Sequence, residues 1–84
     1  LISIVRGQDF SNTKTIVDTF RISLDNSYQL TQPAVFPQTI KTELNSIFLS
    51  NSDFKFIPDS NSIVLSRDVD YHLFDSLFVT YKYL

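Results

Sequence analysis

The side chains best suited to chemistry lie close together near the end of the chain. Asp68, Asp70 and Asp75 supply carboxylates around His72, which is the only histidine. Carboxylates and an imidazole can transfer protons or hold a metal ion when the fold brings them together. A spacing of two in an extended segment places Asp68 and Asp70 on the same side, but the direction of His72 depends on a turn that the sequence leaves unassigned. We therefore expect a solvated acidic loop here rather than a catalytic site.

A second set of oxygen-bearing side chains overlaps this region. Asp59, Asn61 and Asp70 occupy the first, third and twelfth positions of a calcium-loop pattern. The pattern lacks the glycine at its sixth position, and other ligand positions are held by Ile63, Leu65 and Arg67. Residues 58–61, with proline first and aspartate next, fit a hairpin turn better. We therefore predict no metal site and no cofactor.

The composition excludes several other kinds of catalytic and metal-binding site. The chain has 84 residues, no cysteine and one glycine, which excludes disulfides, thiolate metal sites, cysteine nucleophiles and glycine-rich phosphate loops. No Gly-x-Ser-x-Gly motif is present, and a single histidine cannot build a histidine-rich metal site. These features predict that the chain is not an enzyme.

The charge balance argues against two classes of partner. The formal net charge is −2, from 7 Lys and Arg against 9 Asp and Glu, and no basic run occurs. Because phosphate binding needs clustered cations, we expect no double-stranded nucleic acid partner. No stretch approaches the ~20 apolar residues of a membrane-spanning helix, so we expect no membrane contact. A surface rich in Ser, Thr, Asn and Gln favours an extracellular or virion location.

The aromatic side chains offer an alternative function. Tyr28, Tyr71, Tyr81 and Tyr83, together with the phenylalanines, could supply stacking platforms for sugars or bases. Aromatic residues on one face of a strand are more often core or subunit contacts. A small-molecule or carbohydrate-binding module that uses exposed tyrosines is therefore the second hypothesis.

The elements that would position these side chains are mostly strands. Residues 1–6 are predicted to form a short strand that ends at Gly7. Period-two alternation over residues 15–24 predicts a half-buried strand with one face formed by Ile16, Asp18, Phe20, Ile22 and Leu24. Residues 25–27 have turn chemistry, and residues 28–31 are predicted to return as a short strand.

One segment has helical spacing. Pro37 suits the first position of a helix, because its φ is fixed and its missing N–H is not needed there. The apolar residues that follow, at spacings of four, three and one, form a single stripe: Ile40, Leu44, Ile47 and Phe48. We predict one helix over residues 37–49, with this stripe buried against a sheet.

A hairpin and a terminal strand complete the predicted fold. Residues 54–57 and 62–66 flank the turn at 58–61, and residues 76–84 are β-branched and aromatic. The order predicts an α+β fold, in which a twisted antiparallel sheet of about five strands is covered on one face by a single helix. Residues 1–84 are expected to form one domain, a fragment or one subunit of a larger assembly.

The terminal strand leads to the functional prediction. Its alternation directs Leu77, Val79, Tyr81 and Tyr83 toward the core and Phe78 to the opposite face. Because an unpaired apolar strand recruits others, we expect β-augmentation by a second copy or a neighbouring subunit, at an interface of Phe78, Tyr81, Tyr83 and Leu84. The leading hypothesis is a non-catalytic structural or protein-interaction domain of a multi-subunit assembly, such as a virion.

Overall fold

The computed structural model describes residues 12–84, which form seven β-strands and one 3-10 turn, η1 (Pro37–Thr39). The strands are β1 (Lys14–Arg21), β2 (Ser27–Gln29), β3 (Lys41–Leu44), β4 (Ile47–Phe48), β5 (Phe54–Ile57), β6 (Ser62–Leu65) and β7 (Ser76–Tyr83). Within this range no α-helix occurs. The strand predicted at residues 1–6 lies outside the described residues.

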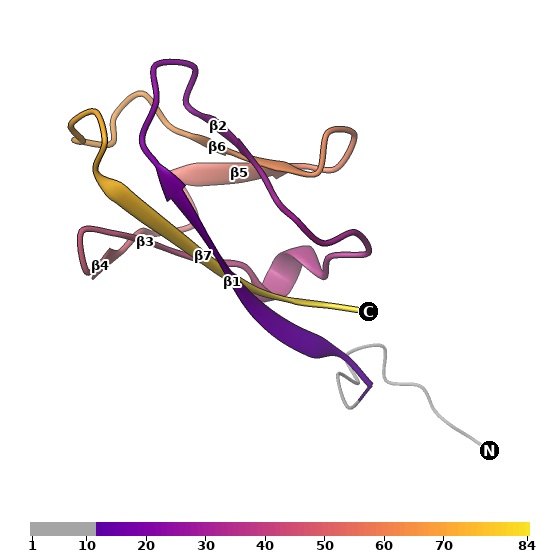
Figure 1. The fold of residues 1–84 in the computed structure, drawn as a ribbon. Coiled ribbons are helices and arrows are strands. Elements are labelled where there is room, and N and C mark those ends of the chain that lie inside the picture. The colour runs from indigo at the N-terminus through magenta and orange to yellow at the C-terminus, as the bar shows by residue number, and fades with distance from the viewer. Residues whose placement is uncertain (1–11) are drawn as a thin grey trace.

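The strands form two antiparallel sheets in the described part of the chain. Sheet A has the order β1-β7-β3-β4, and sheet B has the order β2-β6-β5. Figure 1 shows sheet B lying across one face of sheet A. The chain crosses between the sheets after β1, β2, β4 and β6, so each sheet depends on strands that are distant in the sequence. The fold is a small β-sandwich.

The core lies between the two sheets. Leu77, Val79 and Tyr81 alternate along β7 and are buried, as the sequence predicts. Ile63 and Leu65 of β6 face them from sheet B and belong to the same apolar cluster. Sheet B therefore takes the place that the predicted helix was expected to fill.

The predicted helix over residues 37–49 is wrong, and with it the α+β fold class. Ile40 and Leu44 are buried, but Ile47 and Phe48 are 68% and 67% exposed. Two residues at a spacing of four lie on the same face of a strand and also on the same face of a helix. Burial of Ile40 and Leu44 is therefore consistent with either element. Asn45 and Ser46 both have positive φ, 51° and 69°, the geometry of the two-residue turn that joins β3 to β4.

The terminal strand β7 is an interior strand of sheet A. It pairs with β1 from Lys14↔Tyr83 to Arg21↔Ser76, and with β3 from Lys41↔Thr80 to Leu44↔Leu77. Both of its edges are thus occupied by the chain itself. The prediction that this strand recruits a partner strand is therefore wrong, because it has no free edge to offer.

A buried carboxylate links sheet A to the segment that follows β2. Asp18 of β1 is buried and accepts hydrogen bonds from the Tyr81 hydroxyl at 2.6 Å and from the Thr31 backbone N–H at 2.8 Å. The Thr31 hydroxyl donates a third bond, at 2.6 Å. Burial, followed by the hydrogen bond to Asp18, raises the pKa of Tyr81. The alternation in the sequence placed Asp18 on the apolar face, where these donors satisfy it.

Thr42→Val is expected to stabilise the fold. Thr42 is completely buried in β3, and its hydroxyl has no hydrogen-bonding partner among residues 12–84. An unsatisfied buried hydroxyl costs about 1–3 kcal/mol, and valine has nearly the same shape without it. We expect the free energy of unfolding to rise by about 1 kcal/mol in urea denaturation. A loss of stability would show that the hydroxyl has a partner.

Candidate protein interface

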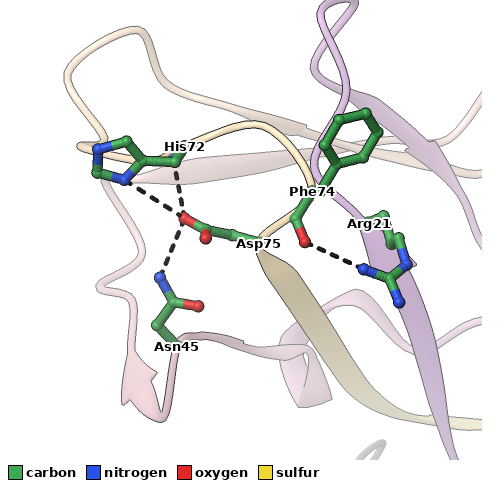
Figure 2. Close-up of polar contacts among 5 residues, drawn as sticks. All are labelled: Arg21, Asn45, His72, Phe74 and Asp75. Carbon is green, nitrogen blue, oxygen red and sulfur yellow. Dashed lines mark hydrogen bonds and ion pairs between the residues drawn. The ribbon is translucent and has the colours of Figure 1, made fainter.

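The turn that carries His72 is fastened to the β3–β4 hairpin by Asp75. The Asp75 backbone N–H donates to the His72 carbonyl at 3.1 Å, which closes a four-residue turn. The Asp75 carboxylate accepts the His72 backbone N–H at 2.8 Å and the Asn45 side-chain amide at 3.0 Å (Figure 2). These bonds, the one from the His72 backbone first, lower the pKa of Asp75. Asp75 is therefore a structural carboxylate.

The other residues of the acidic segment do not converge on His72 as a metal-binding group. The His72 side chain is 86% exposed, and its Nδ1 lies 3.9 Å from Asp75 Oδ2. Asp68 and Asp70 are also exposed. Across residues 12–84, no three His, Asp or Glu side chains are placed so that they could hold a metal ion. Asp68, Asp70 and His72 are thus exposed to solvent, whereas Asp75 is partly buried by its hydrogen bonds.

The residues of the calcium-loop pattern have separate places in the fold. Asp59 is exposed in the turn between β5 and β6. Asn61 ends that turn, and its side-chain amide donates to the carbonyls of Gln32 at 2.9 Å and Leu30 at 3.4 Å. Asp70 lies in the segment before β7. Asn61 therefore holds the hairpin against the segment that follows β2.

The tyrosines do not form an exposed stacking platform. Tyr28 and Tyr81 are buried in the core, and Tyr71 and Tyr83 are half-buried against it. The Tyr81 and Tyr83 rings contact each other with centroids 6.3 Å apart. The hydroxyl of Tyr28 accepts the Ser23 backbone N–H at 3.0 Å, so this ring has a structural role.

The predicted interface residues of β7 and the C-terminus are divided among three environments. Phe78 is half-buried on the outer face of sheet A, where its cross-strand neighbours are Thr19 and Glu43. Tyr81 is 1% exposed and faces sheet B, and Tyr83 is half-buried beside it. Leu84 is exposed, and its N–H donates to the Ala34 carbonyl at 3.2 Å. Their role in an interface stays a prediction.

Exposed apolar side chains gather at one end of sheet A. Seven large apolar residues are exposed in residues 12–84, and all but Val17 and Leu84 lie where β1 ends and β7 begins: Leu24, Ile47, Phe48, Leu73 and Phe74. We call this region the loop end and define it as residues 22–26, 45–48 and 66–75. Its loops occupy one end of the ribbon in Figure 1. Several exposed apolar side chains gathered in one region are typical of a protein contact.

The loop end is held together by hydrogen bonds between its segments. Ile22 and Phe74 are joined by a backbone bond of 3.0 Å, and the Ile22 N–H donates to the Asp75 carbonyl at 2.9 Å. The Arg21 guanidinium donates to the Phe74 carbonyl at 3.4 Å, as Figure 2 shows. On the other side, the Asn45 amide reaches Asp75. The three segments are thus ordered without a partner.

Phe74 has an unfavourable backbone conformation. Its φ is 70°, in the left-handed region that glycine and asparagine favour and that bulky residues avoid. Its side chain is 71% exposed, so packing against the described residues offsets little of the free-energy cost of this backbone conformation. A strained, exposed aromatic side chain is typical of a residue kept for a contact rather than for stability.

Phe74→Asn is expected to raise the stability of the domain. Asparagine tolerates positive φ, and the left-handed conformation costs other residues roughly 1–2 kcal/mol. We expect a gain of about 1 kcal/mol in the free energy of unfolding, measured by thermal or urea denaturation. Leu73→Asn is the matched control, because Leu73 is exposed next to it without a positive φ. A destabilised Phe74→Asn would show that the ring supports the fold.

A groove lies between the β3–β4 hairpin and the segment before β7. Its volume is about 270 Å³. Apolar side chains form part of the lining, namely Leu44, Ile47, Leu49 and Val69. Three carboxylates, those of Asp53, Asp68 and Asp70, also line it, and no lysine or arginine does. The groove therefore combines apolar walls with negative charge.

Sequence reasoning missed the loop end because it assigned Ile47 and Phe48 to a buried stripe. Exposure of the pair follows from the turn at Asn45 and Ser46, which carries no glycine to signal it. Residues 67–75 have no element that the sequence pattern predicts, although the segment contains two consecutive apolar residues, Leu73 and Phe74, in a polar stretch. No protein-family model matches the chain, and no curated protein or solved structure is significantly similar to it. Among residues 12–84, no helix is long and apolar enough to cross a membrane.

Proposed function

We propose that this chain is a non-catalytic protein-interaction domain of a multi-subunit assembly, and that the loop end is its contact surface. The observation that supports this proposal is the gathering of exposed leucine, isoleucine and phenylalanine side chains at one end of sheet A. Fully burying such a side chain is worth about 1.5–3 kcal/mol. A partner that covers Phe48 and Phe74 alone would gain several kilocalories per mole from their burial.

The order of the loop end favours binding. The Asp75 carboxylate and the bonds from Arg21 and Asn45 hold its segments in place before any partner arrives. Binding then loses less conformational entropy than it would with loose loops, so more of the burial energy remains as affinity. The strain at Phe74 fits the same function, because it keeps an aromatic ring on the surface.

No observation favours the second hypothesis, a carbohydrate or small-molecule module that uses exposed tyrosines. Two of the four tyrosines are in the core and the other two are half-buried. The exposed aromatic rings of the described residues are Phe48 and Phe74, which have no hydroxyl to orient a sugar. The apolar character of these residues suits a protein surface better.

The test compares two double variants that make similar changes in different places. Phe48→Ser with Leu73→Ser removes apolar surface from the loop end, and Val17→Ser with Leu84→Ser removes it elsewhere. All four side chains are exposed, so both variants are expected to fold. Sedimentation equilibrium measures self-association, and selection from a displayed random-peptide library measures binding of other chains.

We expect the wild-type chain to self-associate or to select peptides, and the loop-end variant to lose this binding at least tenfold, which corresponds to about 1.4 kcal/mol. The control variant should change binding less than twofold. A wild-type chain that stays monomeric at high concentration and selects no peptide would contradict the proposed function. Binding that only the control variant loses would place the interface on another surface.

A further inference from the structure

We propose that the free edge of β4 binds an extended segment of another protein, and that a lysine or arginine of this segment enters the acidic groove beside it. This inference rests on the proposed function and names the class of partner and the mode of contact. It combines two independent features, an unpaired edge strand and a groove of complementary charge.

The first feature is the backbone of β4. Leu49 donates its N–H to the Thr42 carbonyl at 2.8 Å, and the neighbouring opposed pair is Phe48↔Glu43. Hydrogen-bonded and non-hydrogen-bonded pairs alternate in an antiparallel ladder, so the N–H and C=O of Phe48 point away from β3. Neither group has a backbone partner among residues 12–84. An added strand would satisfy both groups.

The same edge strand also lacks a protecting charge. Lysine or arginine on an edge strand discourages pairing with other chains. The outer strand β1 has Lys14 and Arg21, and β5 has Lys55. Ile47 and Phe48 are both apolar and exposed. The edge strand β2 also lacks lysine and arginine, but its exposed residues are the polar Ser27 and Gln29. In the described part of the chain, β4 is therefore the edge strand that combines exposed apolar side chains with no protecting charge.

The two faces of β4 have different surroundings. Ile47 is opposite buried Leu44 and lines the groove, whereas Phe48 is opposite Glu43 on the outer face. Phe48, Glu43, Phe78 and Thr19 form one cross-strand row across sheet A. Alternate residues of an added strand would thus extend this row and reach the groove.

The charge of the groove selects the partner. Asp53 accepts hydrogen bonds from the Ser50 backbone and hydroxyl, but no described residue forms a hydrogen bond or ion pair with the carboxylates of Asp68 and Asp70. A cationic side chain from the added strand would pair with these carboxylates while its alkyl stem contacts the apolar lining. A second copy paired symmetrically through β4 would instead bring two acidic grooves together, which is unfavourable.

The experiment uses two blocked peptides of alternating valine and threonine that differ only in a central lysine or glutamate. Affinity is measured by fluorescence anisotropy with the full chain, and hydrogen exchange of the Phe48 amide is followed by NMR. We expect the lysine peptide to bind roughly tenfold more tightly than the glutamate peptide, and the Phe48 amide to become protected. Added salt should reduce the difference.

Two charge variants with the same net charge complete the design. Asp68→Asn with Asp70→Asn should abolish the preference for lysine, and Asp59→Lys should retain it, since Asp59 is exposed in the turn between β5 and β6, outside the loop end and the groove. Equal affinity for the two peptides, or no binding of either, would overturn the inference. Protection of Phe48 by raised protein concentration alone would also overturn it in favour of a second copy, and would leave the proposed function standing.

Discussion

Asp18→Ala is expected to lower the free energy of unfolding by about 3 kcal/mol, because it removes hydrogen bonds to a charged group that are worth roughly 1.5 kcal/mol or more each. The Tyr81 hydroxyl, buried in the core, would lose its acceptor, and the Thr31 hydroxyl and N–H would lose theirs. Small domains of this length often have only about 5 kcal/mol in total. Urea denaturation should therefore show a largely unfolded variant at moderate denaturant.

The control for Asp18→Ala is Thr19→Ala, one residue along β1 on the exposed face, which should change stability by less than about 0.5 kcal/mol. The pH dependence provides a second check. The pKa of Tyr81 is raised in the folded chain, so its contribution to stability is complete below its ordinary value of 10.0 and is lost as the pH rises through the folded value. Tyr81→Phe should remove this alkaline loss. Equal effects of Asp18→Ala and Thr19→Ala would contradict the buried network.

Leu44→Ala is expected to cost about 2–5 kcal/mol, whereas Ile47→Ala should cost less than about 1 kcal/mol. Leu44 is 4% exposed between the sheets, and Ile47 on the other side of the turn is largely exposed. Truncation of Leu44 removes buried methyl groups and leaves a cavity, and truncation of Ile47 does neither. Chemical denaturation of the two variants measures both values.

This pair of variants separates the observed hairpin from a helix. In a helix over residues 37–49, Leu44 and Ile47 would share one buried stripe, and both truncations would be costly. A large loss of stability from Ile47→Ala would therefore contradict the β3–β4 hairpin. Lys41→Ala, on an exposed strand position, provides the baseline for a substitution without burial.

The strands with strong period-two alternation were predictable from the sequence. β1 follows the alternation that includes Asp18, and β5 and β6 form the predicted hairpin around residues 58–61, with Ile57 paired to Ser62. The terminal strand also has the predicted inward and outward faces. In these segments, local pattern and tertiary burial agree, because each strand has one face toward the core.

The β3–β4 region was not predictable in the same way. Ile40 and Leu44 fit either period, and the turn between the strands uses Asn45 and Ser46 in place of the usual glycine. The pairing of β7 with both β1 and β3 is also set by contacts between distant residues rather than by local pattern. An edge strand and an interior strand of the same composition look alike in one sequence.

The candidate site was also only partly predictable from the sequence, because its position depends on contacts between distant residues. The sequence predicts protein contact at the terminal strand because that strand is apolar and β-branched. In the structure, β1 and β3 pair with the two edges of β7, whereas β4 has a free edge and the side chain of Phe74 is exposed. That difference depends on which strand is outermost and on a positive φ at Phe74, neither of which the residue types reveal.

The most direct test of the proposed interface is an NMR map of where a bound chain contacts the protein. Isotope-labelled protein is titrated with the tightest peptide from the library selection, and amide shift changes are assigned to residues. We predict that the largest changes lie in residues 45–48 and 72–75, with smaller changes at Phe78. Changes confined to sheet B or to the C-terminal residues, with the loop end unaffected, would contradict the proposal.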